Sequence, residues 1–186
     1  MKSIKNMTQA ELAAYVHSQL QKVGIDVILS GGAAVGIFTN GKYVSRDIDL
    51  INVKFAQREI IEEVMEKMGF ISVGRHFEHP QTDQIIEFPP GPLLFGNARV
   101  DNIIELEFDS GILRVISPTD CVKDRLAHYF HWGDRQCLAQ AIMVIENHEV
   151  DFDGIKNWSK MEGKLSEFDK IRSKLFDAVK SKSNDK

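Results

Sequence analysis

Residues 28–50 read ILSGGAAVGIFTNGKYVSRDIDL and combine a glycine turn with a pair of aspartates. The turn is Ser30-Gly31-Gly32, which follows an apolar run and precedes a short segment of small residues. Because glycine has no side chain, an anion can approach the backbone there, and the N–H groups at the start of a helix attract it. The alternative interpretation is a tight turn that needs positive φ and binds nothing.

Asp47 and Asp49 form the second half of the pattern, two residues apart in a second apolar run. Residues i and i+2 of a strand lie on one face, with Cα atoms roughly 6–7 Å apart. Two such carboxylates can converge on metal ions about 3.5–4 Å apart, the arrangement of two-metal phosphoryl transfer. The alternative is an exposed edge strand of alternating polarity. Ile48 and Leu50 flank Asp49 and favour a partly buried site, where two like charges need a cation.

The spacing from Ser30-Gly31-Gly32 to Ser45-Arg46-Asp47-Ile48-Asp49 resembles the signature of the nucleotidyltransferase superfamily, which has the polymerase-beta-like fold of antibiotic adenylyltransferases and minimal nucleotidyltransferases. The resemblance covers roughly the first third of the chain. It implies that Mg²⁺ or Mn²⁺ binds the two aspartates and that a nucleoside triphosphate (NTP) is the substrate. It also implies a phosphate site made by Ser30, Gly31, Gly32 and Ser45.

The resemblance further implies a third carboxylate on a later strand, beside the first two. We assign it to Glu87, an acid at the end of the apolar run Gln84–Phe88, as a further metal ligand and catalytic residue. Asp101 and Glu105 are the competing candidates on the next expected strand. The superfamily more often has Asp than Glu at this place, so Glu87 departs from the usual pattern.

A second group of candidates lies in residues 120–136, DCVKDRLAHYFHWGDRQ. Lys123 and Arg125 are cations that could neutralise a triphosphate, and Tyr129 or Trp132 could stack on a base. The alternative is a helix pair with solvated charges and aromatic side chains packed between the two parts of the chain. His128 and His131 are three residues apart, but without a cysteine pair or a His-Glu-x-x-His arrangement we expect no zinc site.

Composition and charge limit the classes of protein to consider. The chain has 186 residues, 43% of them hydrophobic and 27% charged, which is ordinary for a globular protein. A net charge of -4 argues against extended nucleic-acid binding, since proteins that bind phosphate backbones are usually basic. With two cysteines, no apolar N-terminal leader and no membrane-spanning run, we expect a cytoplasmic protein that does not contact a membrane.

The periodicity of apolar residues predicts an α/β (α+β) fold, with a small mixed β-sheet, helices on one side of it, and a helical C-terminal part. Strands are expected at 27–29, 47–53, 70–73, 84–88, 102–108 and 112–116, and helices at 8–23, 31–38, 55–68, 118–130, 134–147, 153–161 and 166–180. The expected division is an α/β domain at 1–117, the helical part packed on it at 118–180, and a disordered tail at 181–186.

These features favour a metal-dependent enzyme that moves a nucleoside monophosphate from an NTP to an unknown acceptor, which could be a small molecule, a protein or an RNA. The resemblance also implies a rival: a non-catalytic nucleotide-binding or protein-interaction protein, such as a toxin–antitoxin component. Three acids gathered at one place favour the enzyme, whereas scattered acids favour the rival.

Overall fold

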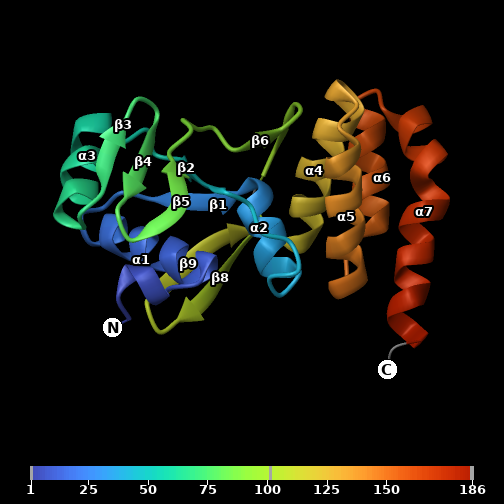
Figure 1. Ribbon diagram of the computed structural model, residues 1–186. Coiled ribbons are helices and arrows are strands. Elements are labelled where there is room, and N and C mark those ends of the chain that lie inside the picture. Colours follow the sequence, from blue (N-terminus) through green and yellow to red (C-terminus); the bar gives the residue numbers. More distant parts are fainter. Residues whose placement is uncertain (1, 101, 185–186) are drawn as a thin grey trace.

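A computed structural model describes residues 2–100 and 102–184 and contains a sheet with helices, followed by a stack of four helices (Figure 1). The mixed α/β architecture expected from the sequence is confirmed. No helix in residues 2–100 and 102–184 combines the length and apolarity needed to cross a bilayer.

The main sheet has seven strands in the order β3-β4-β5-β2-β1-β9-β8. Their bounds are β1 Val27–Ser30, β2 Asp47–Asn52, β3 Ile71–Val73, β4 His76–His79, β5 Thr82–Glu87, β8 Ile103–Phe108 and β9 Gly111–Ile116. Strand β2 pairs antiparallel with β1 and parallel with β5, and β1 pairs parallel with β9. A separate hairpin of β6 (Leu94–Phe95) and β7 (Ala98–Arg99) lies outside the sheet. The central strands β1 and β2 therefore have a partner on each side.

Three helices accompany the sheet: α1 (Gln9–Lys22), α2 (Gly31–Phe38) and α3 (Arg58–Lys67), after a short 3₁₀ turn at Ile4–Asn6. Helix α1 begins at a capping box, in which the Thr8 hydroxyl accepts from the Glu11 N–H and the Glu11 carboxylate accepts from the Thr8 N–H. It packs on β1, β2, β8 and β9 and contacts both α2 and α3.

Strand β2 shows the alternation that positions the acids. Ile48 and Leu50 are fully buried in the core, whereas Asp47 and Asp49 alternate with them and face the other side of the sheet. A shift of register by one residue would place both carboxylates in the apolar core, so the apolar residues of β2 fix the face on which the acids lie.

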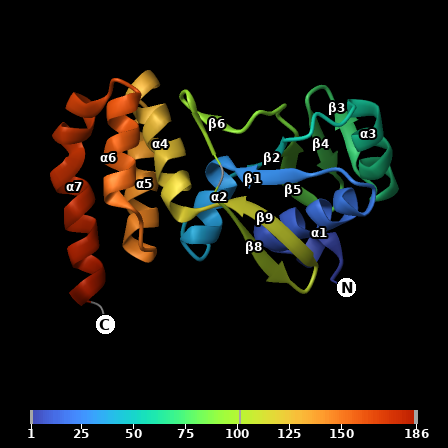
Figure 2. The ribbon, with the colours of Figure 1, turned by 180° about the vertical axis from the view of Figure 1, so that it is seen from behind.

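The C-terminal helices are α4 (Pro118–Trp132), α5 (Arg135–Asn147), α6 (Phe152–Met161) and α7 (Leu165–Asn184), seen at one end of the molecule in Figure 2. Ser117 caps α4, with Pro118 at its first position. Helix α7 continues through Asn184, past Lys180 where the sequence pattern ends it, because neither Gly nor Pro interrupts that stretch. The predicted tail at 181–186 is therefore helical as far as the structure describes it.

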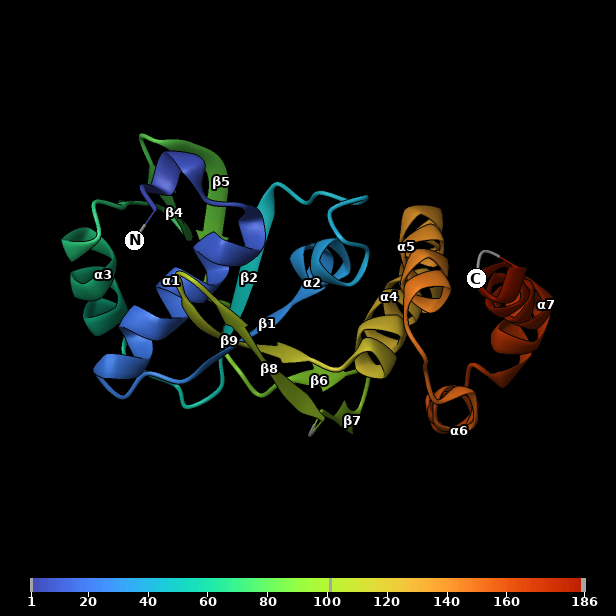
Figure 3. The same ribbon diagram turned by 90° about the horizontal axis from the view of Figure 1, so that it is seen from below.

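Helix α2 joins the two parts. It contacts β1 and β2 on one side and α4 and α5 on the other, and it lies between them in Figure 3. This position explains the composition of α2, because a helix that has neighbours on every face needs apolar residues on every face. Its residues Ala33, Ala34 and Val35 are fully buried. One hydrophobic core consequently runs through both parts, from α1 to α7.

Candidate functional site

The turn between β1 and α2 is built so that a carboxylate can lie against it. Gly31 has φ +71°, a conformation that side chains disfavour, and a Cβ atom there would lie 2.5 Å from Asp49 Oδ2. Ser30 is the register partner of Asp49 across the β1–β2 pair. Two features therefore favour glycine at position 31: the positive φ of the backbone and the close approach of the Asp49 carboxylate.

Gly32 has a different neighbour. A Cβ atom on Gly32 would lie 2.8 Å from Ser45 Oγ and 3.1 Å from Ser45 Cβ. The Ser45 hydroxyl accepts from the Asp47 N–H at 3.3 Å, and the Ser45 carbonyl accepts from Gln9 Nε2 at 2.7 Å. Ser45 thus connects the start of α2 with the start of β2, and Gly32 leaves the space that it occupies.

We expect the substitution Gly32→Ala to lower the free energy of unfolding and NTP affinity together, because Ser45 has to move. The matched test is a double-mutant cycle with Ser45→Gly, which removes the two atoms nearest to the new Cβ and leaves only Tyr43 Cε1, at 3.4 Å. We expect a favourable coupling energy of about 1 kcal/mol or more from denaturant unfolding. Strictly additive effects would show that Ser45 does not limit the residue at position 32.

The three predicted acids lie on adjacent strands. Glu87 on β5 is the register partner of Asp49 on β2, so their backbones are about 4.8 Å apart and their side chains leave the same face of the sheet. Asp47 is exposed, whereas Asp49 and Glu87 are partly buried. The structure thus brings together the acids that the sequence separates by some forty positions.

Of the two competing acids, Glu105 belongs to the described residues and does not join this group. Asp101 lies outside the described residues. Glu105 is on β8, separated from β2 by β9 and β1, and is the register partner of Arg114, whose Nε is 3.9 Å from the Glu105 carboxylate.

The electrostatics of Asp49 set it apart from an ordinary surface acid. Burial, together with the negative charges of Glu87, Asp47 and Asp124, raises the pKa of Asp49 from its usual value near 3.8 to about 6, against the opposing effect of Arg125. A cation bound beside Asp49 would reverse this effect. The chain therefore maintains a destabilised carboxylate at the glycine turn.

A cavity of about 270 Å³ opens in front of Asp49 and is closed on the far side by α4. Its lining includes Ser30, Gly31 and Asp49 from the sheet, Asp124, Arg125 and His128 from α4, and several residues of the segment 89–95. The Arg125 guanidinium donates to Asp124 Oδ2 at 2.6 and 3.1 Å and to Gln140 Oε1 at 3.3 Å. Arg125 is thus already balanced by a carboxylate, and its charge is only partly available to a ligand.

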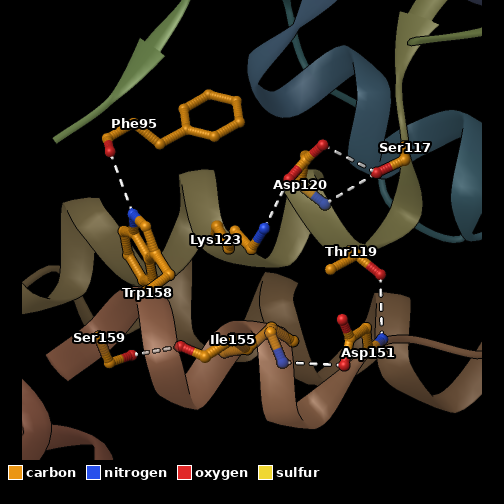
Figure 4. A network of polar contacts seen from close by, with 10 residues as sticks. Phe95, Ser117, Thr119, Asp120, Lys123, Asp151, Ile155, Trp158 and Ser159 are labelled. Atoms are coloured by element: carbon orange, nitrogen blue, oxygen red, sulfur yellow. Dashed lines mark hydrogen bonds and ion pairs between the residues drawn. The ribbon is translucent and has the colours of Figure 1, made fainter. Parts of the chain in front are cut away.

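Of the two cations predicted in this region, Arg125 lines the cavity and Lys123 does not. Lys123 Nζ donates to Asp120 Oδ1 at 2.9 Å, near the start of α4 (Figure 4). Asp124 is a residue that the sequence reasoning missed, because an acid between a lysine and an arginine on a helix is usually solvated. Its burial became evident only from the way α4 docks against α2 and the segment that contains β6.

The segment 89–95 forms the third wall, and a buried tryptophan holds it. Trp158 Nε1 donates to the Phe95 carbonyl at 3.1 Å, as Figure 4 shows, and both side chains are buried. The Asn52 N–H donates to the Pro89 carbonyl at 2.9 Å and ties the start of the segment to β2. The wall is therefore attached both to the sheet and to the C-terminal helices.

Asp47, Asp49 and Glu87 could bind Mg²⁺ only if a substrate supplied further oxygen ligands. Within residues 2–100 and 102–184, no three His, Cys, Asp or Glu side chains are grouped closely enough to enclose a metal ion by themselves. Mg²⁺ in proteins is commonly held by one or two carboxylates together with substrate phosphates and water. The oxygen ligands of Asp47, Asp49 and Glu87 fit that kind of site and not a closed protein cage.

Solved structures with a similar fold are known, although comparisons of the sequence find no match. No model of a protein family matches the sequence, and a search of curated proteins finds no match. Among solved structures, the chain is similar to an antigenic nucleotidyltransferase-like protein from Paracoccidioides brasiliensis, with TM-score 0.66 and 16% identity over 92% of each chain. It is also similar to the antibiotic-resistance factor ANT(2'')-Ia, with TM-score 0.55 and 13% identity over 90% of this chain and 94% of that one. At these identities the likeness shows a shared fold over nearly the whole chain.

Proposed function

We propose that this chain, which has the fold of the nucleotidyltransferase superfamily, moves a nucleoside monophosphate from an NTP to an acceptor in a metal-dependent reaction. The observation that carries the proposal is the position of Asp49. Its carboxylate is partly buried against the Gly31 turn and beside Glu87, with Arg125 lining the same cavity. An unfavourable arrangement of acids of this kind is useful where a cation-bound anion is the ligand.

In the proposed reaction, the acids would bind the metal and the start of α2 would bind the phosphates. Asp47 and Asp49, with Glu87 beside them, would hold Mg²⁺ or Mn²⁺, which supplies charge neutralisation for the phosphates. The N–H groups at the start of α2, with the Ser30 and Ser45 hydroxyls, would orient the phosphate chain. The acceptor oxygen attacks the α-phosphorus, the bond to pyrophosphate breaks, and Glu87 takes the acceptor proton.

The charge of the empty site predicts that metal and nucleotide bind together. Three neighbouring acids repel a triphosphate, and Mg²⁺ alone finds too few protein ligands, so each ligand should strengthen the binding of the other. We expect NTP affinity to rise roughly 5–150-fold when Mg²⁺ is present, the usual range of coupling between ligands. Calorimetric titration with ATP and GTP, with Mg²⁺ and with EDTA, measures this factor, and equal affinities would contradict a metal-bridged site.

Transfer itself is tested by incubating the protein with each labelled NTP, Mg²⁺ and a cell extract as the source of acceptor. Label on a protein, an RNA or a small molecule would support the proposal and identify the class of acceptor. Metal-dependent binding of NTP without transfer to any fraction would instead favour the non-catalytic rival.

A further inference from the structure

Helix α4 carries a column of side chains that leads away from the acids. Asp124, His128 and Trp132 are four residues apart in turn, so they share one face of the helix. Asp124 and His128 line the cavity that contains Asp49. The ring of His128 lies 4.9 Å from the ring of Trp132, and its Nε2 lies 3.9 Å from the Asp124 carboxylate. The column therefore leads from the charged residues of the cavity to Trp132, which lies one helical turn beyond the lining residue His128.

Trp132 is unusual in its exposure. With 73% of its surface accessible, it is the most exposed aromatic side chain among the described residues, whereas Trp158 is 4% exposed and donates a hydrogen bond. Because Trp132 is the last residue of α4 and its ring contacts those of His128 and His131, with centroids 4.9 and 5.9 Å away, the ring is supported while most of its surface stays accessible. A flat ligand can therefore stack on Trp132 without any side chain having to leave.

The spacing along α4 matches the length of a nucleotide. His128 is about 6 Å and Trp132 about 12 Å from Asp124 along the helix axis. A phosphate placed at Asp49 and the Gly31 turn would bring the attached ribose and base alongside these two rings. Leu93 and Leu94 line the same cavity, and Leu94 is 44% exposed, so an apolar wall is also available. The cavity thus combines charged side chains with the His128 ring and an apolar wall, and Trp132 follows His128 by one helical turn.

We propose that His128 and Trp132 form the platform on which the nucleobase of the NTP stacks, with Leu94 of the same cavity as an apolar contact. This inference rests on the proposed function for the position of the phosphates. It assigns recognition of the base to the C-terminal helices, while the sheet and its glycine turn hold the phosphates and the metal. Stacking on an aromatic side chain contributes about 1–3 kcal/mol per base.

The test compares Trp132→Ala with Trp132→Phe, using two ligands that share phosphates but differ in the base. The first ligand is the Mg²⁺ complex of whichever common NTP binds the wild-type chain most tightly, and the second is Mg²⁺–tripolyphosphate. In calorimetry we expect Trp132→Ala to weaken NTP binding roughly 5–150-fold and to leave tripolyphosphate binding within about twofold. Trp132→Phe should recover most of the loss, because an aromatic face remains.

The control variant is Ile71→Ala, which removes another largely exposed apolar side chain, 60% accessible, from β3 at the far edge of the sheet. It should change neither affinity. Quenching of Trp132 fluorescence by the NTP, but not by tripolyphosphate, is a second readout. The inference is overturned if Trp132→Ala leaves NTP affinity unchanged or weakens both ligands equally. If neither ligand binds the wild-type chain, the proposed function fails as well, whereas binding of both without transfer refutes the enzyme and leaves the platform in place.

Discussion

Asp49→Asn should lower any transfer activity by about a thousandfold or more and, at the same time, stabilise the fold. Activity falls because a metal ligand is lost, and several kcal/mol of charge stabilisation are lost with it. Stability rises because the neutral amide removes a carboxylate whose pKa is raised to about 6 by burial and by its acidic neighbours. We expect an increase in the free energy of unfolding of about 2 kcal/mol at pH 7–8.

The pH dependence of this difference provides an independent check. Between pH 4 and pH 6 the unfolded chain has released the Asp49 proton while the folded chain retains it, so the wild type loses stability as the pH rises. Below pH 4 the acid is protonated in both states and the penalty is absent. Denaturant unfolding of both proteins from pH 4 to pH 8 should therefore show curves that separate as the pH rises.

Asp47→Asn is the matched control for Asp49→Asn, because Asp47 is on the same strand and the same face but is exposed. It should also reduce activity, since it removes a proposed metal ligand, while changing the free energy of unfolding by no more than about 0.5 kcal/mol. If Asp49→Asn were destabilising, or left turnover unchanged, the assignment of Asp49 would be wrong.

Gly31→Ala should be the most damaging substitution in the glycine turn. Positive φ costs an L-residue about 1–2 kcal/mol, and the new Cβ atom would lie 2.5 Å from Asp49 Oδ2. The carboxylate has to move, so we expect a loss of at least about 2 kcal/mol in the free energy of unfolding and at least about a tenfold loss of Mg²⁺–NTP affinity. Denaturant unfolding and calorimetry measure the two effects.

Gly24→Ala separates the cost of backbone strain from the cost of the clash with Asp49. Gly24 has φ +80°, and a Cβ atom there would meet no atom within 4 Å, so the substitution adds backbone strain without a clash. It should cost about 1–2 kcal/mol of stability and leave ligand affinity unchanged. Equal effects of the two substitutions on stability, with Mg²⁺–NTP affinity intact in Gly31→Ala, would show that Gly31 serves the backbone alone.

The sequence was sufficient to predict the central strands, because their signals are local. The alternation in β2 places Ile48 and Leu50 in the core and the aspartates on the other face, as the structure has them. Strand β4 was not predicted, since His76–His79 reads HFEH and lacks β-branched residues. The hairpin of β6 and β7 was missed as well, because its two-residue strands give no periodic pattern.

The far wall of the site could not be predicted in the same way. Neighbouring residues on a helix point about 100° apart. Whether Lys123, Asp124 or Arg125 faces the acids therefore depends on how α4 rotates and docks against α2, which no local pattern encodes. The structure places Asp124 and Arg125 at the cavity and pairs Lys123 with Asp120. Pairing of β5 with β2 is likewise a long-range property, and it brings Glu87 beside Asp49.

The burial of α2 between the sheet and α4 and α5 has a consequence for how this protein can be divided or recombined. A fragment that stops at residue 117 would expose the face of α2 on which α4 and α5 pack, including the contact of the Phe38 ring with His148 at 5.1 Å. The same helix carries the glycine turn at its start. The glycine turn, which we propose binds the phosphates, therefore depends on the helices that follow it in the chain, and a truncation or recombination experiment has to keep the two together.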